Sequence, residues 1–341
     1  MKPGAILTTL IENILELSRQ NSQGGLSPWF IRNLENQIDA GVFLADGKLD
    51  QVGEALIRRL ADYREQAGIS TAVLGMSGGV DSALTASLFK RAGWRVVGFT
   101  LPIDQNPNET ARGVEACEAL GLEHQNIDLT DLYQATIKTL APADPDLPAD
   151  NTARLRRGNL RARLRMATLY NIAASQGGLV ASTDNHSELT AGFWTLHGDV
   201  GDISPIQSLL KSWEVPYLAK TLGVPQSNWA ATPTDGLGTG GTDEQQIGAS
   251  YLEWDIMVAA LQAALIRHGS ALTRANLAAS LDVPLDVDER AALVFRNVTA
   301  RLGGTWYKRV SPLQFEHPVF PRLQSLALLD AQLFQPDAVK E

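Results

Sequence analysis

The sequence predicts an α/β fold in which a parallel sheet carries helices on both faces, with helical additions at the amino and carboxyl ends. Short apolar runs alternate with amphipathic stretches, which is the pattern of successive strand–helix–strand units. The first runs are nearly continuous in apolar residues, as in strands buried on both faces. A loop rich in Gly and Ser follows the first run and leads into a helix, where parallel sheets place their ligands.

The amino-terminal part is predicted to be helical. The apolar side chains of residues 4–18 fall on one helical face, and those between Leu49 and Leu60 form a second such face. Residues 21–28, NSQGGLSP, are turn-forming and are expected to act as a linker. We therefore assign residues 1–48 to a helical extension of the main domain.

The main domain is predicted over residues 49–310, followed by a tail over residues 311–341. Its strands are expected at residues 71–76, 94–101, 123–128 and 179–182. Helices are expected at residues 83–91, 109–120, 161–174, 243–267 and 286–302. Residues 142–151, rich in Pro and Asp, are expected to form a loop.

Composition and charge exclude several classes of protein. The 341 residues carry 29 basic and 38 acidic side chains, a net charge of −9, which argues against a nucleic-acid groove as the main feature. Cys117 is the only cysteine, so the sequence offers neither an intrachain disulfide nor a cysteine-rich zinc site. No apolar run approaches the roughly 20 residues of a membrane span. We expect a cytoplasmic protein that binds neither nucleic acid nor membrane.

The most informative segment is Ser77–Ser82, SGGVDS, between the first strand and its helix. Glycines without a Cβ let backbone N–H groups approach phosphate oxygens, and the helix N-terminus adds partial positive charge. A Walker A loop would end in Gly-Lys-Ser/Thr, whereas this loop carries Asp81. A carboxylate beside phosphate is reasonable as a ligand for Mg²⁺. The alternative is an ordinary helix cap after a glycine turn. The loop resembles the SGGxDS signature of the ATP pyrophosphatases.

Three further motifs follow in order along the chain. They are GNLRARLRM at residues 158–166, STDNHSEL at 182–189 continuing to GDVGDISP at 198–205, and PTDGL at 233–237 followed by TDE at 242–244. Together with SGGVDS they resemble the ammonia-dependent NAD⁺ synthetases over residues 50–310. That resemblance implies an adenine nucleotide α-hydrolase-like fold. It also implies that ATP adenylates deamido-NAD⁺, that pyrophosphate leaves, and that ammonia displaces AMP to give NAD⁺.

The resemblance also assigns roles to individual residues. The residues implied for ATP are Gly75, Met76, Ser77, Gly78, Gly79, Val80, Asp81, Ser82, Thr183, Lys211 and Thr234. The implied Mg²⁺ ligands are Asp81 and Glu188. Contact with deamido-NAD⁺ is implied for Arg161, Leu196, Asp202, Tyr307 and Lys308. Asp81, Lys211 and Asp202 are implied to be catalytic, with Asp202 helping to take protons from the attacking nitrogen.

Each assignment has a simpler structural alternative. Glu188 could complete a capping box with Asn185, the two threonines could be turn or cap hydroxyls, and Lys211 could be a solvated helix lysine. The chain also departs from the family pattern at the substrate. Leu196 stands where Lys is common, Tyr307 stands where His is usual, and the loop 198–203 is one residue shorter.

The nitrogen source and the assembly are also implied by the resemblance. Glutamine-using members carry a separate amidase domain with a nucleophilic Cys, whereas Cys117 falls inside the helix predicted at residues 109–120. We therefore expect free ammonia as the nitrogen donor, although another chain could supply an amidase. The family implies a homodimer with the dinucleotide at its interface.

Three other functions remain open at this point. Nicotinate mononucleotide could be amidated by the same mechanism. Another ATP pyrophosphatase, such as a tRNA-thiolating enzyme, would need catalytic cysteines and is disfavoured by a pI near 5.1. A non-catalytic ATP-binding regulator would not require two metal carboxylates.

Overall fold

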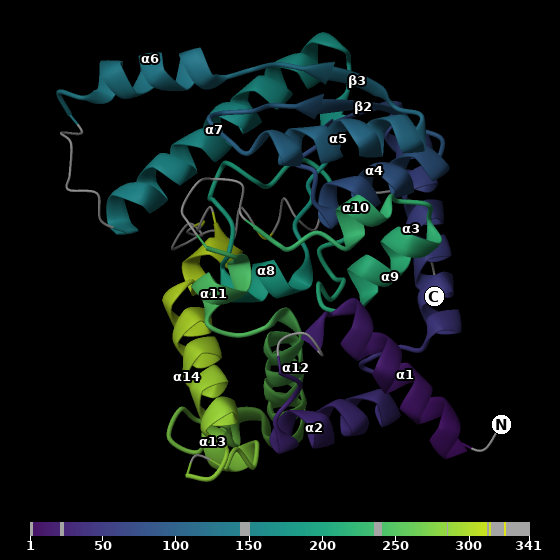
Figure 1. The fold of residues 1–341 in the computed structure, drawn as a ribbon, viewed down its shortest axis with the longest axis vertical. Helices are drawn as coiled ribbons and strands as arrows, with labels where there is room; N and C mark the ends of the chain where they lie inside the picture. The colour runs from purple at the N-terminus through teal and green to yellow at the C-terminus, as the bar shows by residue number, and fades with distance from the viewer. Residues whose placement is uncertain are drawn as a thin grey trace.

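A computed structural model describes residues 3–20, 24–143, 151–234, 241–284, 286–311, 314 and 324. Four parallel strands form one sheet in the order β3–β2–β1–β4. Figure 1 shows β2 and β3 side by side at the top of the view. The strands are β1 (Thr71–Gly75), β2 (Arg95–Thr100), β3 (Glu123–Asn126) and β4 (Leu179–Val180). The predicted parallel sheet is confirmed, and each strand lies within its predicted range.

The strand register brings the loops that follow the strands to one edge of the sheet. Thr71 of β1 pairs with Arg95 of β2, and the pairing runs to Gly75 opposite Phe99. On its other side β1 pairs with β4 through Ala72 and Val73. Because all strands are parallel, the segments after Gly75, Thr100 and Val180 leave the sheet in the same direction.

Helices cover both faces of the sheet, as predicted. One face packs against α3 (Asp46–Ala67), α4 (Val80–Arg91), α5 (Pro107–Leu120) and α9 (Glu214–Thr221). The other face packs against α6 (Thr130–Leu140) and α7 (Asn151–Ser175). Side chains of β1 alternate between these cores, with Leu74 in the first and Val73 in the second.

A further hydrophobic core lies below the sheet in Figure 1. It is formed mainly by α1 (Pro3–Leu17), α2 (Pro28–Asp39), α12 (Tyr251–His268) and α14 (Glu289–Gly304). Trp29 and Phe30 of α2 and Trp254 of α12 are fully buried in it. The amino-terminal extension therefore shares its core with the carboxyl-terminal helices. The proposed boundaries near residues 48 and 310 stay predictions.

Some elements begin or end at other residues than the sequence predicts. The helix predicted at 161–174 begins ten residues earlier, at Asn151, and the stretch predicted at 243–267 is two helices, α11 (Asp243–Ile247) and α12. Gly248, with φ 76°, ends α11 in a left-handed conformation, and the Ser250 side chain caps α12. The linker Asn21–Pro28 is only partly described, and α2 begins at Pro28. Most of the tail, 311–341, and most of the Pro/Asp-rich loop lie outside the described residues.

The remaining helices are short. They are α8 (His186–Ala191), α10 (Gln226–Trp229), α13 (Leu277–Ser280) and the 3₁₀ helices η2 (Gly269–Ala271) and η3 (Trp306–Val310). Among the described residues, no helix combines the length and apolar character needed to cross a membrane.

Candidate active site

The loop Ser77–Ser82 connects β1 to the N-terminus of α4, as the sequence predicts. Gly78 adopts φ +85°, a conformation that favours glycine, and Gly79 is the N-cap residue of α4. The Ser77 and Ser82 hydroxyl oxygens lie 3.1 Å apart, and the Gly79 N–H donates to Ser77 Oγ. These contacts hold the loop against the helix end, where backbone N–H groups attract anions.

Neighbouring segments fix the Gly78 peptide from outside the loop. Its carbonyl oxygen accepts hydrogen bonds from Arg112 Nε at 3.2 Å and from Asn228 Nδ2 at 3.1 Å. A Cβ at this position would collide with the backbone carbonyl of Glu109. Gly78 is therefore required both by its φ angle and by the close approach of α5.

A cavity of about 1420 Å³ opens over this loop between the sheet and the lower core. Twelve of the predicted site residues line it: Gly75, Met76, Ser77, Gly79, Val80, Asp81, Thr183, Glu188, Lys211, Thr234, Tyr307 and Lys308. Gly78, Ser82, Arg161, Leu196 and Asp202 do not line it. Gly78 and Ser82 are instead buried, and the Ser82 hydroxyl donates to the Gly79 carbonyl at 3.2 Å.

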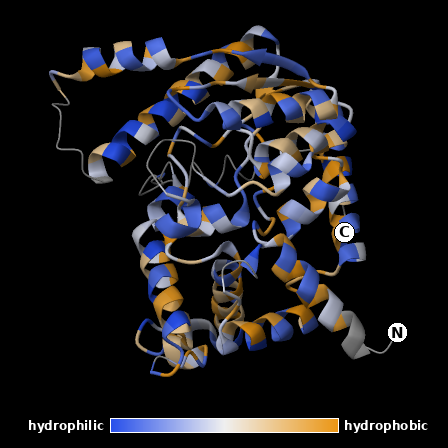
Figure 2. Cartoon of the chain, viewed as in Figure 1, coloured by the Kyte–Doolittle hydropathy of each residue, from blue (hydrophilic) through white to orange (hydrophobic). Residues whose placement is uncertain are grey.

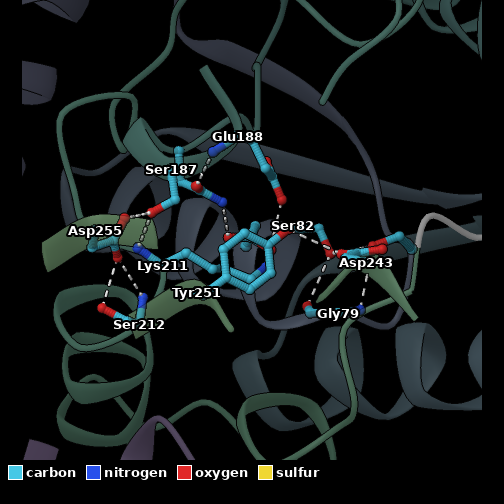
Figure 3. Close-up of polar contacts among 12 residues, drawn as sticks. Gly79, Ser82, Ser187, Glu188, Lys211, Ser212, Asp243, Tyr251 and Asp255 are labelled. Carbon is cyan, nitrogen blue, oxygen red and sulfur yellow. Dashed lines mark hydrogen bonds and ion pairs between the residues drawn. The ribbon is translucent and has the colours of Figure 1, made fainter. Parts of the chain in front are cut away.

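Three residues of the cavity lining, Asp81, Lys211 and Glu188, form an ion cluster, and Figure 3 labels Lys211 and Glu188. Lys211 Nζ donates to Asp81 Oδ2 and lies 3.7 Å from Glu188 Oε1. Asn185 caps α8 by accepting from the Glu188 N–H at 3.0 Å, and its Nδ2 donates to Asp81 Oδ1 at 3.0 Å. The helix cap and the orientation of Asp81 therefore depend on the same side chain.

The three ionisable side chains of this cluster are largely buried, with 7–16% of each exposed. Burial and the nearby Asp81 carboxylate raise the pKa of Glu188 well above its ordinary value, although Lys211 opposes this. Burial alone would lower the pKa of Lys211, but Asp81 and Glu188 raise it, so the amine stays protonated. The cluster therefore holds one fixed cation between two carboxyl groups that repel each other.

A second pair of acids lines the cavity beside this cluster. Burial and the nearby Asp199 raise the pKa of Asp184 to about 8, while the Ser182 hydroxyl donates to it at 3.0 Å. Burial also raises the pKa of Asp199, although the Thr195 N–H donates to its carboxylate. With Glu109 and Asp243, these acids bring the carboxyl side chains that line the cavity, among the described residues, to six.

The predicted acid Asp202 lies elsewhere. Its carboxylate accepts from Tyr170 Oη at 2.9 Å and from the Val180 N–H at 2.8 Å, so it ties α7 to β4 outside the cavity lining. Asp199, three residues earlier, is the acid that reaches the cavity wall. This placement does not support a direct part for Asp202 in proton transfer.

The substrate-side residues divide into two groups. Tyr307 and Lys308 of η3 line the cavity, and Lys308 Nζ donates to the carbonyls of Gly192 and Trp194. Arg161 stacks 4.7 Å from the ring centroid of Tyr133, outside the lining. Leu196 is half-buried outside the lining, and its carbonyl accepts from Arg163. Contact of these two residues with a dinucleotide, and the homodimer, stay predictions.

Comparison with known proteins identifies the family. The family model described as NAD synthase matches residues 52–292. The chain belongs to the NAD synthase family.

Similar proteins agree with this assignment. An NH₃-dependent NAD⁺ synthetase of Alkaliphilus metalliredigens is 38% identical over 202 residues, covering 58% of this chain and 81% of the relative. A protein of the same name from Methanococcoides burtonii is 34% identical over 266 residues, covering 77% and 93%. The solved structure of an NMN synthetase from Francisella tularensis is 28% identical with a TM-score of 0.61, covering 80% of this chain and 99% of that one. The resemblance inferred from the motifs is confirmed.

The donor set of this NAD synthase site fits Mg²⁺ brought in with ATP. Asp81 and Glu188 offer carboxylate oxygens beside the phosphate loop, and burial of two like charges favours a cation there. No group of three or more His, Cys, Asp or Glu side chains among the described residues is arranged to hold a metal by itself. Mg²⁺ commonly binds to one or two carboxylates together with substrate phosphates, which matches this arrangement.

Sequence reasoning missed several residues of the NAD synthase cavity, including Gln105 and Arg112, although Arg165 belongs to the GNLRARLRM motif. Arg165 Nη2 donates to Gln105 Oε1 at 2.6 Å, and its Nε donates to the Leu101 carbonyl at 3.0 Å. Gln105 follows the carboxyl end of β2, next to the phosphate loop after β1. That position after a predicted strand was the available signal, because parallel strands direct their following loops to one edge.

Proposed function

We propose that the chain catalyses ATP-dependent amidation of deamido-NAD⁺ by ammonia, giving NAD⁺, AMP and pyrophosphate through an acyl-adenylate. The observation that carries this proposal is the Asp81–Lys211–Glu188 cluster beside a phosphate loop, inside a cavity that extends to Lys308. The names of the relatives, NH₃-dependent NAD⁺ synthetases, supply the substrate class.

In the first step, a carboxylate oxygen of deamido-NAD⁺ attacks the α-phosphorus of ATP, and pyrophosphate leaves with the bonding electrons. The α4 N-terminus and the Ser77 hydroxyl would hold phosphate oxygens, and Lys211 would supply positive charge to the departing group. Mg²⁺, when bound, would neutralise phosphate charge and link it to Asp81 and Glu188. Catalysis in this step is mainly positioning and electrostatic stabilisation.

In the second step, ammonia attacks the acyl carbon, a C–N bond forms, and AMP leaves with one of the former carboxylate oxygens. The nitrogen must lose a proton. Asp184 and Asp199 are candidate acceptors because they line the cavity and burial raises the pKa of each, which makes the carboxylate a stronger base. Phe193, Trp194 and Tyr307 add aromatic surface to the wall, which helps to exclude water from the reactive adenylate.

A second candidate is amidation of nicotinate mononucleotide by the same two steps. It is favoured by one observation, the structural similarity to an NMN synthetase. The phosphate loop and ion cluster serve both reactions equally, since the acids differ only in the adenylyl group. Comparison of kcat/KM for the two acids in one assay separates them.

Ammonium should support the reaction of the purified protein, whereas ammonia-free glutamine should not. The only cysteine, Cys117, is fully buried in α5, and burial raises the pKa of its thiol to about 12, so it is no nucleophile for an amide. The rate should rise with pH as ammonium deprotonates, until other groups titrate. Chromatography of nucleotides would measure this. Equal rates with glutamine, or release of ADP and phosphate, would contradict the proposal.

A further inference from the structure

A buried carboxylate lies beneath the ion cluster without lining the cavity. Asp255 of α12 is 2% exposed. Its Oδ1 accepts from Ser187 Oγ at 2.6 Å, and its Oδ2 accepts from Ser212 Oγ at 2.7 Å and from the Ser212 N–H at 3.2 Å (Figure 3). Burying a carboxylate away from water destabilises the fold unless its oxygens accept hydrogen bonds, as they do here.

The donors to Asp255 are direct neighbours of the ion cluster. Ser187 precedes Glu188 in the first turn of α8, and Ser212 follows Lys211. Ser187 Oγ also accepts the backbone N–H of Lys211 at 3.0 Å. One carboxylate therefore connects the segment carrying Lys211 to the helix carrying Glu188.

Other hydrogen bonds hold the residues just before Lys211, since the Leu209 carbonyl accepts from the His186 N–H at 2.9 Å and the Leu210 N–H donates to Glu214 Oε2 at 2.9 Å. Lys211 itself belongs to no regular secondary structure. It lies in a run of turns before α9, so neither a helix nor a strand fixes its direction. The ring of Tyr251, also on α12, lies 5.7 Å from Lys211 Nζ. Trp254 of α12 donates to Thr190 of α8 at 2.9 Å. These contacts make α12 the element against which both charged side chains are placed.

The amino-terminal extension also contacts α12 and the Lys211 segment. Gln37 Nε2 of α2 donates to the Ile256 carbonyl at 2.9 Å, next to Asp255. Trp213 Nε1 donates to the Leu44 carbonyl at 2.8 Å, next to Ser212. Gln37 and Leu44 lie outside the residues 52–292 that match the family. Residues of this extension therefore contact the sequence neighbours of Asp255 and Ser212.

We propose that Asp255 is a positioning residue that sets Lys211 and Glu188 against Asp81. The effect on turnover rests on the proposed function, whereas the placement of Lys211 does not. Errors of about 1 Å in a catalytic group lower rates by about 100-fold. Asp255→Asn keeps the shape of the side chain but replaces one acceptor oxygen with an NH₂ group. Because an NH₂ group cannot accept a hydrogen bond, the contacts from Ser187 or from Ser212 are lost.

The test uses the full chain and two readouts. Turnover with ammonium should fall by about 100-fold in Asp255→Asn, with a smaller change in KM for ATP. Separately, acetylation of Lys211 by acetic anhydride, without ATP or Mg²⁺, is followed by mass spectrometry. It should be about fivefold faster in Asp255→Asn, because the amine opens to solvent more often.

Glu253→Gln is the matched control. Glu253 is also 2% exposed and lies on the same helix, but its side chain pairs with Arg290 and accepts from the Ser250 N–H, and neither residue belongs to the ion cluster. This variant should lose stability and keep both readouts within about twofold of wild type. If Asp255→Asn does not fold, Ser212→Ala removes one donor and should show about a fivefold loss of turnover.

The possible results distinguish the positioning role of Asp255 from the proposed function. Faster acetylation in Asp255→Asn supports the positioning role even if wild type makes no NAD⁺, an outcome that would count only against the proposed function. Unchanged acetylation and turnover in folded Asp255→Asn would overturn the inference. It would also be overturned if Glu253→Gln changed both readouts as much, because the effect would then follow from stability alone.

Discussion

Asp81→Asn is expected to slow adenylation by about 1000-fold while the fold is retained. The amide keeps the size of the side chain and can still accept from Asn185, but it removes the charge that binds Lys211 and that would hold Mg²⁺. Loss of one group that stabilises transition-state charge costs about 100- to 1000-fold, and loss of the metal site adds to it. Exchange between pyrophosphate and ATP that depends on deamido-NAD⁺ measures this step alone.

Glu123→Gln is a suitable control for Asp81→Asn. It makes the same chemical change in an exposed carboxylate that pairs with Arg95 at 2.6 Å on β2 and β3. Exchange should stay within about twofold of wild type, because surface ion pairs contribute little. If Asp81→Asn exchanged pyrophosphate and ATP at nearly the wild-type rate at limiting Mg²⁺, the role proposed for Asp81 would be contradicted.

Lys211→Met is expected to lower kcat by about 100-fold or more, since the proposed mechanism loses the cation that would stabilise the departing pyrophosphate. It should also lower the free energy of unfolding by about 3 kcal/mol near neutral pH, because Asp81 and Glu188 then face each other unneutralised. Without Lys211 the already raised pKa of Glu188 rises further. A carboxyl whose folded-state pKa is raised destabilises the fold as pH rises through that pKa.

The stability loss in Lys211→Met should therefore be larger at pH 7.5 than at pH 5.5, as measured by urea unfolding. Lys220→Met, on the exposed side of α9, makes the same change away from the cluster and should leave activity and stability nearly unchanged. If the loss in free energy of unfolding in Lys211→Met became smaller as the pH rises, the proposed charge interactions of Asp81, Glu188 and Lys211 would be contradicted.

The sheet and the phosphate loop could be predicted because their signals are local. The apolar run 71–76 and the SGGVDS loop after it determine strand, turn and helix start within a dozen residues. The amino-terminal half of α7 was harder to predict. Figure 2 shows that this half of the helix is largely hydrophilic. There the apolar period is weak, and the helix was predicted ten residues too short.

Long-range contacts account for what sequence reasoning missed. Helix α2 follows a glycine-rich turn, and its burial depends on α12, more than 200 residues away. Asp202 was the predicted acid, but the fold places Asp199, three residues earlier, in the cavity wall, while Asp202 accepts a hydrogen bond from Val180 of β4. The acid inside the apolar run of α12, Asp255, was visible in the sequence, but its partners lie 43 and 68 residues away.

The fate of one oxygen atom tests the central claim most directly. Deamido-NAD⁺ labelled with ¹⁸O in its carboxylate is incubated with the purified protein, ATP, Mg²⁺ and ammonium, and AMP is analysed by mass spectrometry. An acyl-adenylate transfers one carboxylate oxygen to the phosphate of AMP, so AMP should carry one ¹⁸O for each NAD⁺ formed. Unlabelled AMP, or label recovered in inorganic phosphate, would contradict the account.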